Sequence, residues 1–213
     1  MLKSVNKIIK VLVLGDAFLN SGWGLIAPVF AIYIIQNIKG GDIMVAGFAA
    51  AVYWIVKSII QMPFAKYLDR NHGEKDDFYA VFFGLLLVSL VPLGYMVSTL
   101  PWHIYAFQIL YAIGMALVVP AWFGLYTRHI DKGKEAYEWS VYSTSFGFIA
   151  GISGAIGGVI AAAIGFKIIF LLISFFTIMA ATIFYSLRDE ITAVHIHNTS
   201  VKAVDVPAEK LRF

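Results

Sequence analysis

The chain has 213 residues, of which 60% are hydrophobic and 14% are charged, and its mean hydropathy is +0.80. A soluble domain has about a quarter of its residues charged, and a soluble fold of this length could not bury so much apolar surface. The net charge is +3, but the basic residues lie in short loops between apolar runs, so we expect no nucleic-acid partner. With no cysteine the chain can form neither a disulfide nor a thiolate metal site, and we expect no cofactor and no metal.

Six segments of the chain are long enough and apolar enough to cross a lipid bilayer as helices. They lie at roughly 9–35, 44–66, 77–98, 102–126, 138–164 and 167–187. The fold class is therefore an all-α membrane protein, with one six-helix bundle over residues 1–187. The sequence turns polar at Arg188, so we expect residues 188–213 to form a cytoplasmic tail.

Lys and Arg are distributed unequally between the two sides of this bundle. One side receives only Lys39 and Lys167. Apart from Lys57, which lies within a span, all other basic residues fall on the opposite side, those of the tail included. The positive-inside rule therefore predicts a multi-pass protein of the cell (inner) membrane with both termini in the cytoplasm.

A short pattern occurs twice in the predicted helices. Gly22 precedes Pro28 in GWGLIAP, and Gly114 precedes Pro120 in GMALVVP, 92 residues later. The copies lie in the first and the fourth span, which are three positions apart in the order of spans, so they would point in opposite directions. This arrangement is typical of an inverted repeat, with two three-helix halves at about 8–98 and 102–187.

Charged and amide side chains within the apolar runs occur in four of the six segments. From Phe78 to Ser98 and from Ile168 to Leu187 the third and sixth carry no ionisable group other than tyrosine, so we expect them to face lipid. The other four would surround something polar. An ionised group near the bilayer centre costs about 2.5–3.5 kcal/mol on insertion scales. The charged and amide residues in these four segments are Asp16, Asn20, Lys57, Gln61, Gln108 and Glu138. For the two acids, Asp16 and Glu138, the alternative is that they reach water at the cytoplasmic ends of their helices.

Helical spacing places several of these residues on shared faces. Aromatic, amide and charged groups that share a face suit a cavity for a small organic molecule, although core packing remains the alternative for the aromatic residues. The predicted cavity residues are Asp16, Asn20 and Trp23, then Tyr53, Lys57 and Gln61, then Gln108 and Tyr111. In the fifth segment Gly147, Gly151, Gly154 and Gly158 lie along one edge, where they would allow another helix to approach closely.

Four motifs follow one another along the chain. The first helix has a glycine-rich stretch with Gly22 and Gly24 that ends at Pro28, and the fourth ends with the run from Gly114 to Pro120. The loop from Ala65 to Lys75 reads AKYLDRNHGEK, and the fifth helix carries Ser153, Gly154, Gly157 and Gly158. Over about residues 8–190 these motifs resemble one half of a major facilitator superfamily transporter. The loop is similar to the cytoplasmic family signature G-x-x-x-D-R-x-G-R-K, and the fifth helix is similar to the Gly-Pro-x-x-Gly-Gly signature of antiporter members.

The sequence departs from the family pattern at four places. Ala65 replaces the leading glycine, one extra residue precedes Gly73, and no proline follows Ser153. Gln108 stands where proton-coupled relatives carry an arginine. The family usually has twelve spans rather than six.

The resemblance implies a secondary active transporter that moves a small organic solute by alternating access. The family cavity lies between two six-helix bundles, so a homodimer would complete it. Spans one and four would then line the cavity, two and five would form the dimer interface, and three and six would lie outside. The resemblance also implies a cytoplasmic gate made by Asp69, Arg70, Gly73, Lys75 and Glu138.

Two other hypotheses remain at this point. The chain could be a regulatory half that does not transport and assembles with a different membrane protein. The run from Gly151 to Gly154 also resembles the Gly-x-Ser-Gly box of rhomboid proteases, but that chemistry needs a histidine in another spanning helix. We therefore expect no enzyme, because every histidine lies in a loop, at a segment end or in the tail: His72, His103, His129, His195 and His197.

Overall fold

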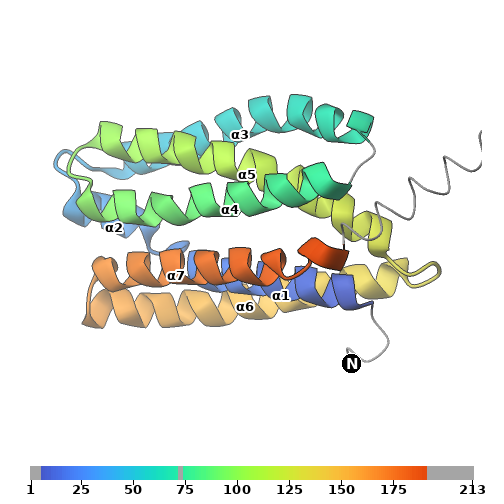
Figure 1. Cartoon of the computed structure of the whole chain (residues 1–213). Coiled ribbons are helices and arrows are strands. Elements are labelled where there is room, and N and C mark those ends of the chain that lie inside the picture. Colours follow the sequence, from blue (N-terminus) through green and yellow to red (C-terminus); the bar gives the residue numbers. More distant parts are fainter. Residues whose placement is uncertain (1–5, 72–73, 191–213) are drawn as a thin grey trace, which may run out of the picture.

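The computed structural model describes residues 6–71 and 74–190, which form seven α-helices (Figure 1). Six of these helices are long and apolar enough to cross a membrane, which confirms the all-α membrane fold for the described residues. In chain order the helices are α1 (Lys7–Ile26), α2 (Phe30–Asn37), α3 (Ile43–Asn71), α4 (Glu74–Val97), α5 (Pro101–His129), α6 (Glu135–Ala163) and α7 (Phe166–Tyr185).

The first predicted span is interrupted at Pro28. Proline has no N–H to donate to the carbonyl four residues back, and α1 ends at Ile26 in a turn where the Val29 N–H donates to the Ile26 carbonyl at 3.0 Å. The equivalent Pro120 lies inside the continuous helix α5. The two copies of the Gly-to-Pro pattern therefore differ locally, because only the first one ends a helix.

The helices pack in an order that differs from their order in the chain. Helices α4 and α7 pack on each other, α4 also packs on α5, and α7 also packs on α1. Helix α3 packs mainly on α5, and α6 packs mainly on α1. Figure 1 accordingly shows α3, α4 and α5 on one side of the bundle and α1, α6 and α7 on the other. Each half of the sequence thus contributes a helix to both sides.

This packing pattern is unchanged when α1 is exchanged with α5, α3 with α6 and α4 with α7. Two glycines follow the same exchange. A Cβ atom at Gly22 would lie 3.1 Å from the Cβ of Phe176, and one at Gly114 would lie 3.1 Å from the Gly84 carbonyl oxygen. The two glycines are 92 residues apart (114 − 22), and so are the two residues that they meet, Gly84 and Phe176 (176 − 84). The pattern is what an inverted repeat would produce, and the repeat itself stays a prediction.

The third and sixth predicted spans, α4 and α7, were expected to face lipid. Each exposes one apolar face, for example at Phe83 and Phe175, as this expectation requires. Both helices are also well covered within the chain: 50% of the residues in the most apolar stretch of α4 and 44% in that of α7 are buried, compared with 6% for α3 and 11% for α6. Apolar composition did not predict this coverage, because lipid tails and apolar helix neighbours favour the same side chains. The position of α4 and α7 outside a larger assembly stays a prediction.

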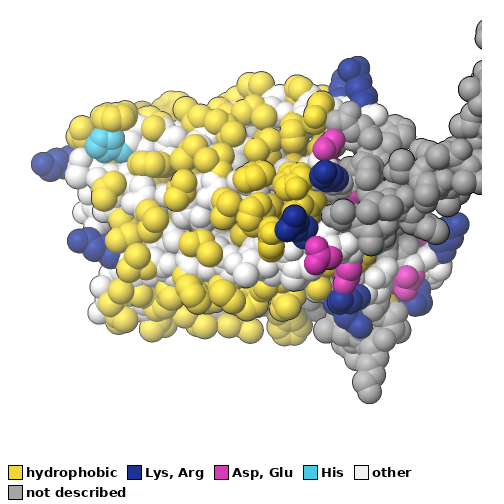
Figure 2. Space-filling view, viewed as in Figure 1, with side chains coloured by type: hydrophobic (Ala, Val, Ile, Leu, Met, Phe, Trp, Pro, Cys, Tyr) yellow, Lys and Arg dark blue, Asp and Glu magenta, His cyan; other side chains and the backbone are white. Residues whose placement is uncertain are grey.

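Helix α1 begins and α7 ends at the same end of the bundle, together with the α3–α4 and α5–α6 connections (Figure 1). On the face drawn in Figure 2 the acidic side chains gather at this end, while hydrophobic side chains cover the middle. The sequence predicts most of the basic residues at this same end of the bundle.

Candidate functional site

Helices α1 and α5 border two cavities that lie one after the other along the same seam. The seam is flanked by α3, which packs on α5, and by α6, which packs on α1. The first is the aromatic cavity, with a volume of ≈ 290 Å³. It is lined by Trp23, Ile26, Ala27, Phe30, Ala50, Tyr53, Trp54, Gln108 and Tyr111.

Three rings in the aromatic cavity join three different helices. The rings of Trp23 on α1 and Tyr111 on α5 are stacked, with centroids 3.9 Å apart and an angle of 9° between the planes. Tyr111 is also stacked on Tyr53 of α3, at 4.6 Å and 18°. Stacked pairs of this kind contribute about 0.5–1.5 kcal/mol beyond their buried area, so the rings form a fixed wall.

Lys57 lies one helical turn after Tyr53, beside this wall. Its ammonium nitrogen is 5.0 Å from the centre of the Trp54 ring and 5.8 Å from that of Tyr53. Both distances are within the range of a cation–π interaction. None of the ion pairs among the described residues includes Lys57.

Two further polar groups at this cavity have no protein partner in the described part of the chain. Gln108 is only 6% exposed and lines the cavity, yet no other described residue is hydrogen-bonded to its amide. The indole N–H of Trp23 is buried without an acceptor. Buried polar groups are usually paired, so these two donors point to something that the cavity would hold.

The second cavity, the Asp16 cavity, has a volume of ≈ 130 Å³. It lies on the seam between α1, α5 and α6, where Asp16 is half-buried. The Asn20 amide donates to the Asp16 carboxylate at 2.7 Å and to the Asp16 carbonyl at 2.9 Å. The lining residues are Asp16, Leu19, Asn20, Met115, Val118, Val119, Trp122, Phe123 and Tyr142.

The structure therefore places seven of the eight predicted cavity residues at two separate cavities. Asp16 and Asn20 line one cavity, while Trp23, Tyr53, Gln108 and Tyr111 line the other, with Lys57 beside it. Gln61 is half-buried on α3 and lines neither. Helical spacing missed Trp54, Trp122 and Tyr142, since it relates residues within one helix and carries no information about its neighbours.

The predicted gate residues are not brought together within one chain. Asp69, Arg70 and Lys75 are exposed at the ends of α3 and α4, and they form no ion pair with another described residue. Gly73 lies outside the described residues. Any contact between these groups and another protein stays a prediction.

Glu138 is 0% exposed, so the interpretation that it reaches water is wrong. Its carboxylate accepts the Asp131 N–H at 3.3 Å through one oxygen, and the other oxygen is buried without a partner. The Tyr126 hydroxyl donates to the Glu138 carbonyl at 2.6 Å, which holds the start of α6 against the end of α5. This fold-back covers a side chain that the sequence placed near a helix end.

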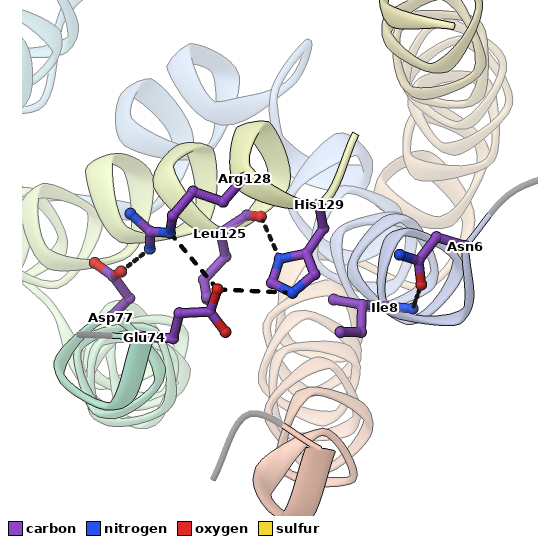
Figure 3. Close-up of polar contacts among 7 residues, drawn as sticks. All are labelled: Asn6, Ile8, Glu74, Asp77, Leu125, Arg128 and His129. Carbon is purple, nitrogen blue, oxygen red and sulfur yellow. Dashed lines mark hydrogen bonds and ion pairs between the residues drawn. The ribbon is translucent and has the colours of Figure 1, made fainter. Parts of the chain in front are cut away.

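An ion-pair cluster that the sequence analysis missed joins the start of α4 to the end of α5 (Figure 3). The Arg128 guanidinium pairs with Asp77, which is 3% exposed, and lies 3.8 Å from Glu74. His129 lies 3.7 Å from Glu74, and its other ring nitrogen contacts the Leu125 carbonyl at 2.9 Å. The sequence signal for this cluster was the acidic residues in the first turn of α4 and the basic residues in the last turn of α5, because each group complements the dipole of its helix.

The small residues of α6 pack on α1 along a different edge from the predicted one. A Cβ at Gly157 would overlap the backbone of Leu25, and one at Gly24 would lie 2.8 Å from the Cβ of Ser153. Gly154 takes part in this contact, 3.6 Å from Pro28 by the same measure. The other three predicted positions have nothing of the described chain within 4 Å: Gly147, Gly151 and Gly158.

The same contact bears on the protease hypothesis. The Ser153 side chain is 7% exposed and packs against Gly24 of α1. No hydrogen bond joins Ser153 to a histidine among the described residues. Among the described residues, therefore, no histidine is positioned as the base that a serine nucleophile requires.

Comparison with known proteins agrees with this architecture. A sequence model of the Major Facilitator Superfamily matches residues 12–210, and a search of curated proteins found no match. The family match extends over nearly the whole chain and includes both cavities on the α1–α5 seam. The chain, a multi-pass membrane protein, belongs to the major facilitator superfamily.

Proposed function

We propose that the protein is a secondary active transporter that moves a small organic solute by alternating access, as a homodimer of six-helix bundles. The observation that carries this proposal is the position of the aromatic cavity on the α1–α5 seam. This seam is flanked by α3 and α6, the two spans that the rest of the chain covers least. In this family the substrate cavity lies between two bundles. A second copy facing the seam would close the cavity.

The polarity of the uncovered helices also favours a second bundle. Lys57 lies at the middle of α3, and the exposed face of α6 carries Ser140 and Thr144. These two hydroxyl residues line a hollow of ≈ 620 Å³ to which the described chain contributes only α6. Polar groups at membrane depth face protein or water rather than lipid. A two-fold axis along the membrane normal would place α3 of each copy against α6 of the other.

The gate and the orientation belong to the same proposal. Both termini and the basic end of the bundle would face the cytoplasm in the cell (inner) membrane. Asp69 and Arg70 would contact the partner near the start of its α6. Because Glu138 is fully buried, exposed residues beside it would make that contact in its place.

Cross-linking through introduced cysteines tests the dimer, because the chain has no cysteine of its own. Met62 on α3 is 69% exposed, and Thr144 is exposed on α6 at a similar distance from the helix middle. The double variant Met62→Cys/Thr144→Cys should form a disulfide-linked dimer in oxidised membranes. The control Phe83→Cys/Phe175→Cys places cysteines on the outer faces of α4 and α7 and should remain monomeric.

Purification and transport assays complete the test. A mass measurement in mild detergent should give a dimer, and counterflow in proteoliposomes should detect movement of a solute that is reduced by Lys57→Ala. A monomer, or verified dimers that move no solute from a broad panel, would refute the proposal. Co-purification of a different membrane protein at fixed stoichiometry would favour the regulatory half over the homodimer.

A further inference from the structure

We propose that the aromatic cavity selects an aromatic anion: a planar ring system that carries one compact negative group such as a carboxylate. The ring would lie against the wall formed by Trp23, Tyr53 and Tyr111, and the negative group would pair with Lys57. This inference rests on the proposed function for the role of the cavity and goes beyond it in naming the chemical class of the solute.

The shape of the cavity wall favours a flat ring. Trp23, Tyr111 and Tyr53 are stacked in sequence with small angles between their planes, so neighbouring rings are nearly parallel. Phe30 and Trp54 add two further aromatic side chains to the lining. Offset stacking on such rings favours planar partners over puckered aliphatic ones.

The charge at the cavity favours an anion. Lys57 is the central residue of α3, with 14 residues to Ile43 on one side and 14 to Asn71 on the other (57 − 43 and 71 − 57). At 1.5 Å per residue it lies about 21 Å from either helix end, which is much farther than a lysine side chain extends. The ammonium group therefore cannot reach the lipid headgroups. An anion that enters the cavity would supply the counter-ion for this group.

The chain does not supply that counter-ion within the described residues. The lining of the aromatic cavity contains neither aspartate nor glutamate. Asp16 lines the other cavity, where the Asn20 amide already donates to it. A cationic solute would meet Lys57 with no carboxylate to balance it, and like charges in a site of low polarity repel strongly.

The remaining polar groups can donate hydrogen bonds to an anion. The Trp23 indole is a donor only, and the Gln108 amide has two N–H donors. Neither is paired with a described residue. An anion with several acceptor oxygens would satisfy them, whereas an apolar solute would leave them unpaired at a cost.

Calorimetric titration of the full chain in phosphatidylcholine nanodiscs tests the inference, with empty nanodiscs as the background. The probes are 2-naphthoate, neutral 2-naphthamide, cationic 2-naphthylmethylammonium and the saturated decalin-2-carboxylate. We expect 2-naphthoate to bind at least about ten-fold more tightly than each of the others, the difference that one unscreened interaction of about 1.4 kcal/mol produces.

Three variants assign this preference to named side chains. Lys57→Met keeps the length of the side chain and should abolish the preference for naphthoate over naphthamide. Lys39→Met, at an exposed position before α3, should leave it unchanged. Tyr111→Leu should weaken the binding of 2-naphthoate and of 2-naphthamide by a similar factor. Gln108→Leu should weaken the binding of 2-naphthoate. This variant tests the cavity independently if Tyr111→Leu does not fold.

The inference is overturned if the cationic probe binds as tightly as naphthoate, if Lys57→Met keeps the preference, or if none of the four probes binds. Loss of naphthoate binding in nanodiscs with phosphatidylglycerol would also overturn it, because Lys57 would then be a site for an anionic headgroup. Binding with the expected preference but without counterflow would refute transport and leave the inference intact. Counterflow of another solute without naphthoate binding would do the reverse.

Discussion

Replacing Gly157 with alanine tests whether the α1–α6 contact holds the bundle together. A Cβ at this position would overlap the carbonyl oxygen, carbonyl carbon and Cα of Leu25. The next residue, Gly158, has nothing of the described chain within 4 Å of the same atom. Gly158→Ala is therefore a matched control in the same helix.

The magnitude of the effect follows from the atoms that are in the way. They belong to the backbone of α1, so they cannot rotate aside, and the two helices must separate. Overpacking of this kind typically costs about 1–3 kcal/mol. Both variants gain the same helix propensity of up to about 1 kcal/mol, so this gain cancels in the comparison. At about 2–4 °C per kcal/mol for a chain of this size, Gly157→Ala should melt roughly 2–12 °C below Gly158→Ala.

The assay is a thermal melt in one detergent, followed by the intrinsic fluorescence of the five tryptophans. The two variants and the unmodified protein should be compared at equal protein and detergent concentrations, since both concentrations shift the apparent melting temperature. A melting temperature for Gly157→Ala equal to or above that of Gly158→Ala would refute the reasoning, because the close approach would then contribute nothing to stability.

Three more melting experiments address buried polar groups. Arg128→Met should destabilise the protein by about 1–3 kcal/mol, less than the loss of one partner from a fully buried ion pair. Adding Asp77→Asn should restore part of this loss, because the two side chains form an ion pair. No restoration would mean that the two groups do not interact. Glu138→Gln should melt no lower than the unmodified protein, because it removes a buried charge that has one unpaired oxygen, and a clear drop would argue for a partner of that oxygen. Ser174→Ala should cost only about 0.6 kcal/mol, the average for hydrogen bonds between membrane helices, although its hydroxyl donates to the Ser89 carbonyl at 2.8 Å; a loss of several kcal/mol would contradict this.

The six spans were predictable from the sequence, and the physical reason is the bilayer. A long apolar segment in a membrane must satisfy all its backbone hydrogen bonds internally, so it forms a helix. The predicted segment 102–126 corresponds to α5 (Pro101–His129), and 138–164 corresponds to α6 (Glu135–Ala163). The break at Pro28 was not predictable from the missing proline N–H alone, because Pro63, Pro92 and Pro120 lie inside continuous helices.

The candidate site was predictable only in part. Spacing on a single helix grouped Asp16, Asn20 and Trp23, and Gln108 with Tyr111; in the structure Asp16 and Asn20 line one cavity, while Trp23, Gln108 and Tyr111 line the other. Spacing could not show that these residues line two separate cavities. That separation depends on which segments of α1 and α5 lie opposite each other, and this register is set by contacts between residues far apart in the chain.

The amino-acid sequence by itself therefore determined the class of fold, the number of spans and the stretch that resembles the transporter family. Tertiary structure alone decided that α4 and α7 are covered more than α3 and α6, that Glu138 is buried, and that Gly157 rather than Gly151 meets α1. The reason is that apolar and small side chains suit lipid and helix contacts equally well. Only the positions of neighbouring helices distinguish the two surroundings.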